Sequence, residues 1–149
     1  MQAQPIDMSD TVSQLNSFLR GELSAVETYQ LAIERLKHSE FHATLMQCAR
    51  SHEERARVLT QAIVARRGIP DSSSGAWGTF ARLVERTAAA ISDKAAIAAL
   101  EEGEDHGRDD YRRDLDKLDP NARQLIEQTI LPEQRRTHDW VATILRSLS

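Results

Sequence analysis

The sequence predicts an all-α protein in which four long helices form one antiparallel bundle, with residues 1–149 as a single domain. The chain has only six glycines and four prolines, and 40% of its 149 residues are hydrophobic. That content is enough for one core without disulfides or a structural metal. Apolar residues recur every three to four positions in four long segments, which is the period of an amphipathic helix. Glycine, proline, serine and aspartate fall between the segments and mark the breaks.

The first two segments predict a helical hairpin. The first helix should begin at Ser9 or Asp10, either of which can cap free backbone amides, and should end near residues 38–39. The second should follow almost at once and stop at Gly68 and Pro70. Because the link is so short, the two helices should run antiparallel. Their apolar stripes are Leu15, Phe18, Leu19, Ala25, Val26, Tyr29, Ile33 and Leu36, then Phe41, Leu45, Cys48, Ala49, Ala56, Leu59 and Ile63.

A long connection follows the first hairpin, over roughly residues 68–92. It starts with the loop sequence DSSSG at residues 71–75. A shorter extra helix is expected over about residues 77–90. Ser92 and Asp93 predict another break and a helix cap. The connection is therefore long enough to cross the length of a bundle.

The rest of the chain predicts a second hairpin. A third helix should span about residues 94–118, a tight turn should follow at residues 119–121, and a fourth helix should reach the C-terminus. Pro132 should kink the fourth helix because proline lacks a backbone N–H. Two hairpins joined by one long crossover are the connectivity of ferritin-like bundles. The stripe residues are Ile97, Leu100, Tyr111 and Leu115, then Leu125, Ile126, Ile130, Val141, Ile144 and Leu148.

Composition excludes several classes of partner. The net charge is −4 with both signs interspersed, so we expect neither nucleic acid nor a membrane surface as a partner. No apolar run approaches the ~18–20 residues that span a bilayer, and no signal peptide is recognisable. Cys48 is the only cysteine, which suits a reducing cytoplasm. A homodimer, a small homo-oligomer or an unidentified protein partner remains open.

Polar residues interrupt all four apolar stripes. Glu22 lies on the first stripe, His52 and Arg55 on the second, and Glu104 on the third. Gln134 or Arg135, together with His138, interrupts the fourth. Counted from the turns at ~1.5 Å per residue, these positions reach similar depths. Burying several charges costs several kcal/mol each unless they are paired or bind metal, so we expect one shared polar layer. Tyr29 and Tyr111 lie one or two turns away and should pack there with satisfied hydroxyls.

Several strings carry a family resemblance. ELSAVETY at residues 22–29 resembles the first metal-binding helix of rubrerythrin-type proteins, and LEEGEDHG at residues 100–107 resembles their third. The strings LRGELSAVETY, SHEERA, EEGEDHG and LPEQRRTHDW together resemble a bacterial family of ferritin-like bundles of unassigned function. Di-metal carboxylate bundles use one Glu from each of two helices and a Glu-x-x-His from each of the other two. The resemblance therefore implies Glu22 and Glu104 as metal ligands.

The departures from that pattern change the expectation. The second-helix slot reads His52-Glu-Glu-Arg55, and the fourth reads Arg135-Arg-Thr-His138. Arginine cannot ligate a metal, because it stays protonated and offers no acceptor. We therefore expect a charge-paired layer without a complete di-metal centre and without a cofactor. The alternative is an iron- or manganese-binding oxidoreductase with an unusual site of two carboxylates and two imidazoles. Its ligands would be Glu22, His52, Glu104 and His138, with Glu53 as a further candidate.

Overall fold

The structure is a computed structural model that describes residues 8–74 and 92–148. Within these ranges the chain is helical and contains no strand, which confirms the all-α prediction. None of the helices described has the length and apolarity needed to cross a membrane. The predicted extra helix at residues 77–90 lies outside the described residues. The helices are α1 (Met8–Arg35), α2 (His42–Ala65), α4 (Asp93–Arg113), the 3-10 turn η2 (Leu115–Lys117), α5 (Pro120–Leu125), the π turn η3 (Ile126–Ile130) and α6 (Leu131–Ser147).

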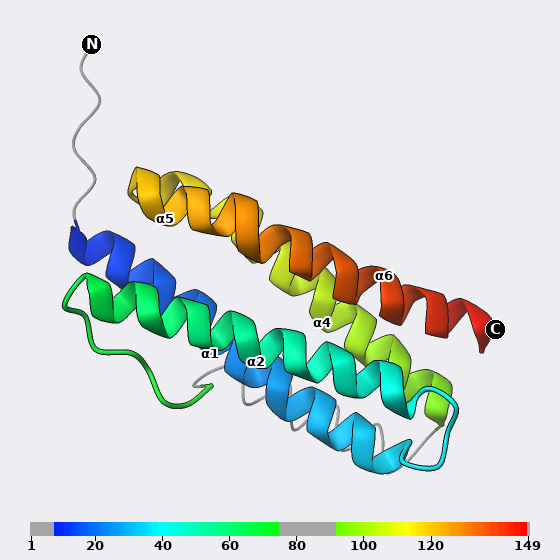
Figure 1. The fold of residues 1–149 in the computed structure, drawn as a ribbon. Coiled ribbons are helices and arrows are strands. Elements are labelled where there is room, and N and C mark those ends of the chain that lie inside the picture. Colours follow the sequence, from blue (N-terminus) through cyan, green and yellow to red (C-terminus); the bar gives the residue numbers. More distant parts are fainter. Residues whose placement is uncertain (1–7, 75–91, 149) are drawn as a thin grey trace.

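Four helical rods lie side by side (Figure 1). The first three are α1, α2 and α4, while α5, η3 and α6 run end to end as the fourth. Figure 1 shows α1 and the fourth rod running in one direction and α2 and α4 in the other. The tightest packing is within the pairs α1–α2 and α4–α6, and α1–α4 and α2–α6 contacts join the two pairs. The two hairpins therefore form a closed four-rod arrangement.

One aspartate fastens the end of the bundle where α5 begins. Asp119 caps α5 by accepting a hydrogen bond from the Ala122 backbone N–H at 2.8 Å, with Pro120 in the first turn. Arg66, just after α2, donates to both carboxylate oxygens of Asp119 at 2.8 and 3.0 Å. The backbone N–H of Asp119 donates to Thr11 Oγ1 on α1 at 2.9 Å. The predicted turn is thus also a junction between three rods.

The fourth rod contains a π turn where the sequence predicts a kink. In η3 the backbone N–H of Leu131 donates to the carbonyl of Ile126, five residues earlier. Pro132 follows immediately in the first turn of α6. Because proline has no N–H and its ring crowds the preceding turn, we attribute the wider turn to Pro132. The helix continues through this point and presents both Ile126 and Ile130 to the core.

The core consists of two apolar clusters with a polar layer between them. On every rod, the residues of one cluster precede the polar positions and those of the other follow them. The polar layer therefore lies near the middle of the bundle, with apolar packing on both sides. One cluster contains Leu15, Phe18, Leu19, Ala56, Leu59, Ile63, Tyr111, Leu118, Ala122, Ile126 and Ile130. The other contains Tyr29, Ala32, Leu36, Leu45, Cys48, Ala49, Ile97, Leu100, Val141 and Ile144.

Candidate functional site, a buried layer of paired charges

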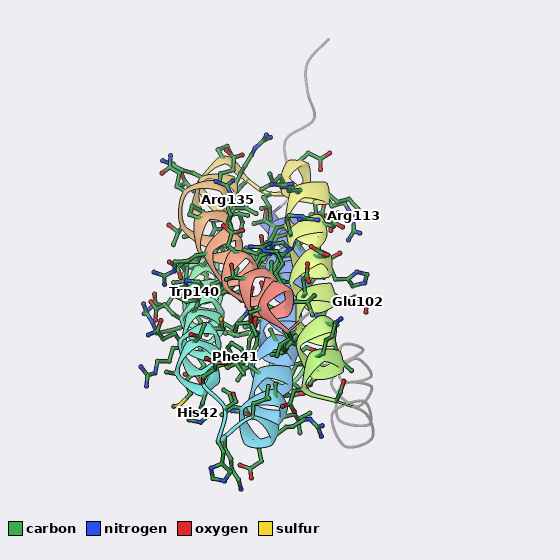
Figure 2. All side chains as sticks on the ribbon, turned by 90° about the vertical axis from the view of Figure 1, so that its right-hand side faces the viewer. Phe41, His42, Glu102, Arg113, Arg135 and Trp140 are labelled. Carbon is green, nitrogen blue, oxygen red and sulfur yellow. The ribbon has the colours of Figure 1, made fainter. Side chains whose placement is uncertain are left out.

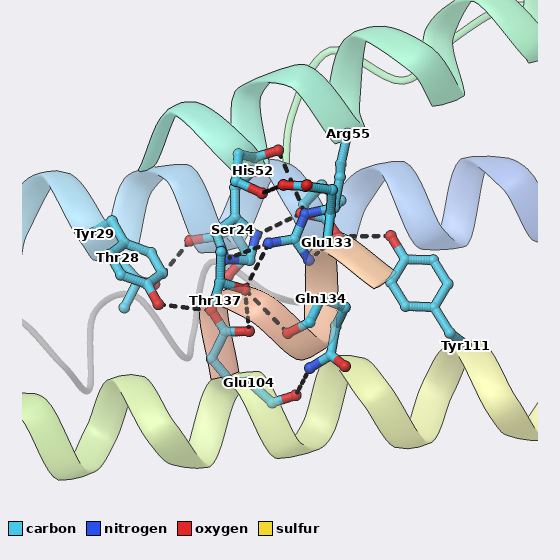
Figure 3. A network of polar contacts seen from close by, with 12 residues as sticks. Ser24, Thr28, Tyr29, His52, Arg55, Glu104, Tyr111, Glu133, Gln134 and Thr137 are labelled. Carbon is cyan, nitrogen blue, oxygen red and sulfur yellow. Dashed lines mark hydrogen bonds and ion pairs between the residues drawn. The ribbon is translucent and has the colours of Figure 1, made fainter. Parts of the chain in front are cut away.

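All four rods contribute a side chain to the polar layer (Figure 3). The structure brings Glu22, His52, Arg55 and Glu104 together, as the stripes predict, and each is at most 5% exposed. These four residues, with Gln134 and Thr137 from α6, are called the polar layer below. Ionisable groups buried this deeply need polar or charged partners, because almost none of their surface is exposed to bulk water.

The His52 imidazole lies between the two carboxylates. Its Nδ1 is 2.6 Å from Glu22 Oε2, and its Nε2 is 2.8 Å from Glu104 Oε1. Both ring nitrogens must carry a proton to donate to both carboxylates, so the ring is an imidazolium. Burial and the Arg55 guanidinium oppose this charge, but the two carboxylates outweigh them and raise the pKa of His52. His52 therefore supplies one positive charge to the polar layer.

Arg55 supplies the second positive charge and is only 2% exposed. Its Nη2 donates to Thr137 Oγ1 at 2.9 Å, and its Nη1 lies 3.5 Å from Glu22 Oε1. Burial lowers the pKa of Arg55, but the two carboxylates raise it by more, so the net shift is upward. Nη2 also lies 3.1 Å from His52 Nε2. That contact joins two donors when His52 is charged, so Thr137 and the nearby Glu22 carboxylate hold the guanidinium.

The two carboxylates are ionised and balance the two cations. Burial alone would raise the pKa of Glu104, but His52 and Arg55 lower it to about 2. For Glu22, too, burial is outweighed, by Arg55 and then His52, and its pKa falls. Two negative and two positive charges meet inside the bundle, so the polar layer is neutral as it stands.

Two buried tyrosines each donate a hydrogen bond to one of the two carboxylates. Tyr29 on α1 donates to Glu104 Oε1 on α4 at 2.6 Å, and Tyr111 on α4 donates to Glu22 Oε1 on α1, also at 2.6 Å. Burial and the adjacent carboxylate raise the pKa of both tyrosines well above the usual range. Each tyrosine follows the glutamate of its own helix by seven residues. Since α1 and α4 are antiparallel (Figure 1), this repeated spacing makes the two hydrogen bonds reciprocal.

The α6 side chains in the polar layer are Gln134 and Thr137. Gln134 Nε2 donates to the backbone carbonyl of Glu104 at 2.8 Å. Thr137 donates its hydroxyl to Glu104 Oε2 at 2.9 Å while it accepts from the guanidinium. Both side chains are buried, at 3% and 0% exposure. The fourth rod thus contributes only neutral groups, which orient Glu104.

Arg135 and His138 are not part of the polar layer. The prediction that places Arg135 there is wrong: its side chain is exposed, and Figure 2 labels it at the outside of the fourth rod. His138 is half-buried and bonds to Asp105 at 2.7 Å instead. The Glu-x-x-His resemblance selects these two positions. A count of 3.6 residues per turn from Ile130 to Val141 selects the two neutral residues instead.

The potential metal ligands in the polar layer do not point at a common position where an ion could bind. The two carboxylates lie against opposite nitrogens of the same ring, and each oxygen that faces the ring already accepts a hydrogen bond. The Arg55 guanidinium lies beside the ring, and its Nη1 is a buried donor without a hydrogen-bond partner among the described residues. Two cavities of about 40 Å³ each adjoin the polar layer between α1 and α4, beside Gly21, Ala25 and Gly103. Each has room for about one or two water molecules.

The chain matches one family, described as "Domain of unknown function (DUF2383)", over residues 10–117. The matched span covers α1, α2, α4 and η2, and therefore every charged member of the polar layer. The fourth rod, with Gln134 and Thr137, lies beyond it. No curated protein and no solved structure shows a significant match. Because the match extends over well more than half of the chain, this protein belongs to the DUF2383 family.

Proposed function

We propose that this protein is a ferritin-like bundle whose polar layer replaces a di-metal centre, and that it works as a metal-independent binding or assembly module. The order of the rods supports the ferritin-like part, because a long connection joins α2 to α4 and these two run in the same direction (Figure 1). The sequence strings that resemble ferritin-like proteins support it as well. In that arrangement, His52-x-x-Arg55 and Gln134-x-x-Thr137 stand where a di-metal bundle carries Glu-x-x-His.

The buried guanidinium of Arg55 is the observation that carries the proposal. It occupies a ligand position, cannot give up its proton, and is held by Thr137 and the Glu22 charge. Two divalent ions at this level would have to displace the guanidinium and deprotonate His52. Each change removes a positive charge that now balances one of the two carboxylates, so the ions would have to replace ion pairs that already exist. The residues therefore fit a charge-paired structural layer better than a redox centre.

Metal content tests the proposal directly. The protein is purified without chelator, and iron and manganese per chain are measured by inductively coupled plasma mass spectrometry. We expect no stoichiometric iron or manganese that depends on Glu22. The matched control is Glu54→Ala, because Glu54 is exposed on the opposite side of α2. About one or two ions per chain that disappear in Glu22→Ala but remain in Glu54→Ala would overturn the proposal and favour an iron or manganese site in the polar layer.

The remaining parts of the proposal concern partners and location. A metal-independent bundle acts through its surfaces, so we propose a homodimer or another small homo-oligomer, measured by light scattering after size-exclusion chromatography. A strictly monomeric protein would require a different protein as partner. We propose a cytoplasmic location because Cys48 is a free, buried thiol with no cysteine to pair with.

A further inference from the structure

A second group of potential ligands lies outside the polar layer, between α4 and α6. Glu101, Asp105 and His138 each place one donor atom within 4.8 Å of the other two. Glu101 and Asp105 are four residues apart on α4 and share one face of the helix. His138 approaches them from α6. All three side chains are half-buried.

His138 is held against one of the two carboxylates of α4. His138 Nε2 lies 2.7 Å from Asp105 Oδ1, and Nδ1 lies 3.8 Å from Asp139 Oδ1. Nε2 is therefore bonded to one carboxylate of the group, while Nδ1 is too far from the exposed Asp139 for a hydrogen bond. The contact with Asp105 holds the ring beside the carboxylates of α4, so one ion could reach all three side chains. Only 20% of the His138 side chain is exposed, which restricts the ring further.

We propose that Glu101, Asp105 and His138 bind one divalent transition-metal ion, with zinc as the preferred ion. One imidazole and two carboxylates are a donor set that zinc accepts, and the imidazole favours it over magnesium or calcium. His138 also borders a groove of about 350 Å³, which has room for water or for an anionic ligand on the ion because Arg108, Arg112 and Arg135 line it as well. The ion would tie α4 to α6. This site shares no residue with the polar layer and does not depend on the function proposed above.

One nearby cation competes with a metal ion. Arg108 Nη1 lies 3.4 Å from Asp105 Oδ1, the oxygen that faces the histidine. Its guanidinium is about one-third exposed and can turn away toward solvent. Removing Arg108 should therefore raise the affinity for the metal ion, because it frees a ligand oxygen and removes a positive charge from the site.

Zinc titration of the full chain tests the proposal. Calorimetry with zinc chloride should show one ion per chain, and the melting temperature should rise with zinc. His138→Ala and Glu101→Gln should each weaken binding at least ~10-fold, and Arg108→Ala should tighten it. The matched controls are His106→Ala and Glu102→Gln, which change exposed residues on α4 and should leave the affinity unchanged.

The outcomes are separable from those of the metal-content experiment. Zinc that remains bound in Glu22→Ala but is lost in His138→Ala supports this site. Absence of saturable zinc binding up to about millimolar concentration would overturn it. Unchanged affinity in His138→Ala, with a native circular dichroism spectrum, would overturn it as well, because the imidazole would then not be a ligand.

Discussion

Removal of the Arg55 guanidinium is the most direct test of charge pairing in the polar layer. Among the described residues, Arg55→Ala leaves Glu22 and Glu104 with His52 as their one cationic partner, so one buried negative charge has no counterpart there. Removing one member of a buried ion pair costs roughly 3–5 kcal/mol. The lowered pKa of Glu104 shows the part that acts through this carboxylate. Moving it from 4.5 to about 2, at about 1.36 kcal/mol per pH unit, stabilises the folded state by about 3 kcal/mol. His52 and Arg55 share that amount, and the pairing of Arg55 with Glu22 adds to the share of Arg55.

The assay is urea denaturation at neutral pH, followed by far-ultraviolet circular dichroism. We expect the free energy of unfolding to fall by roughly 3–5 kcal/mol in Arg55→Ala. Arg57→Ala is the matched control, because Arg57 is exposed and forms an ion pair with exposed Glu54, so stability should change little. Adding Glu22→Gln to Arg55→Ala restores neutrality and should recover part of the loss. A near-neutral Arg55→Ala, or a double variant no more stable than the single one, would refute the reasoning.

Three further predictions follow from the buried titratable groups. The stabilisation from Glu104, whose pKa is lowered to about 2, is present above its ordinary 4.5 and disappears as the pH falls toward 2. Urea unfolding measured across that window should show the loss, and Glu104→Gln should flatten it. The raised pKa of His52 means that its contribution is complete below its ordinary 6.5 and is lost as the pH rises through the raised folded-state value. Long-range proton–nitrogen NMR at about pH 7.5 should therefore show both ring nitrogens protonated, and a neutral ring would contradict the imidazolium. Burial raises the pKa of the Cys48 thiol to about 12, so a thiol reagent at about pH 8 should label unfolded but not folded protein.

The helices and most of the polar layer could be predicted from the sequence because both follow from one period. Glu22, His52, Arg55 and Glu104 lie on apolar stripes, and the short link after α1 fixes the direction of α2. The contacts among these four side chains confirm that they lie at a common level. The predicted cap at Ser92 is also present, where its side chain accepts from the Ala95 N–H at 3.1 Å. Local periodicity and local capping therefore carried this part of the prediction.

The α6 contribution was harder to predict because neutral residues give a weak signal. Gln134 and Thr137 are residue types that are common on helix surfaces, whereas Arg135 and His138 have the spacing of the Glu-x-x-His ligand motif. The motif and the helical period disagree by one residue, and the structure follows the period. The third helix also ends at Arg113, earlier than predicted, and continues as the 3-10 turn η2.

The reciprocal tyrosines depend on a relation that no single helix contains. Each Glu-to-Tyr spacing of seven residues is visible in the sequence. Which carboxylate each tyrosine reaches depends on the antiparallel alignment of α1 and α4 across the long connection. A repeated spacing on the first and third helices was the available signal. The sequence supplies the two side chains, and the tertiary alignment decides the partners.

The unequal share of charge between the two hairpins favours docking of unlike hairpins. The α1–α2 hairpin brings Glu22 with His52 and Arg55, so it carries one excess positive charge, while the α4–α6 hairpin brings only the negative charge of Glu104. Two α1–α2 hairpins facing each other would enclose like charges, and so would two α4–α6 hairpins. A domain-swapped dimer would keep unlike hairpins together and preserve the balance. The buried charges thus favour contact between an α1–α2 hairpin and an α4–α6 hairpin over contact between two hairpins of the same kind.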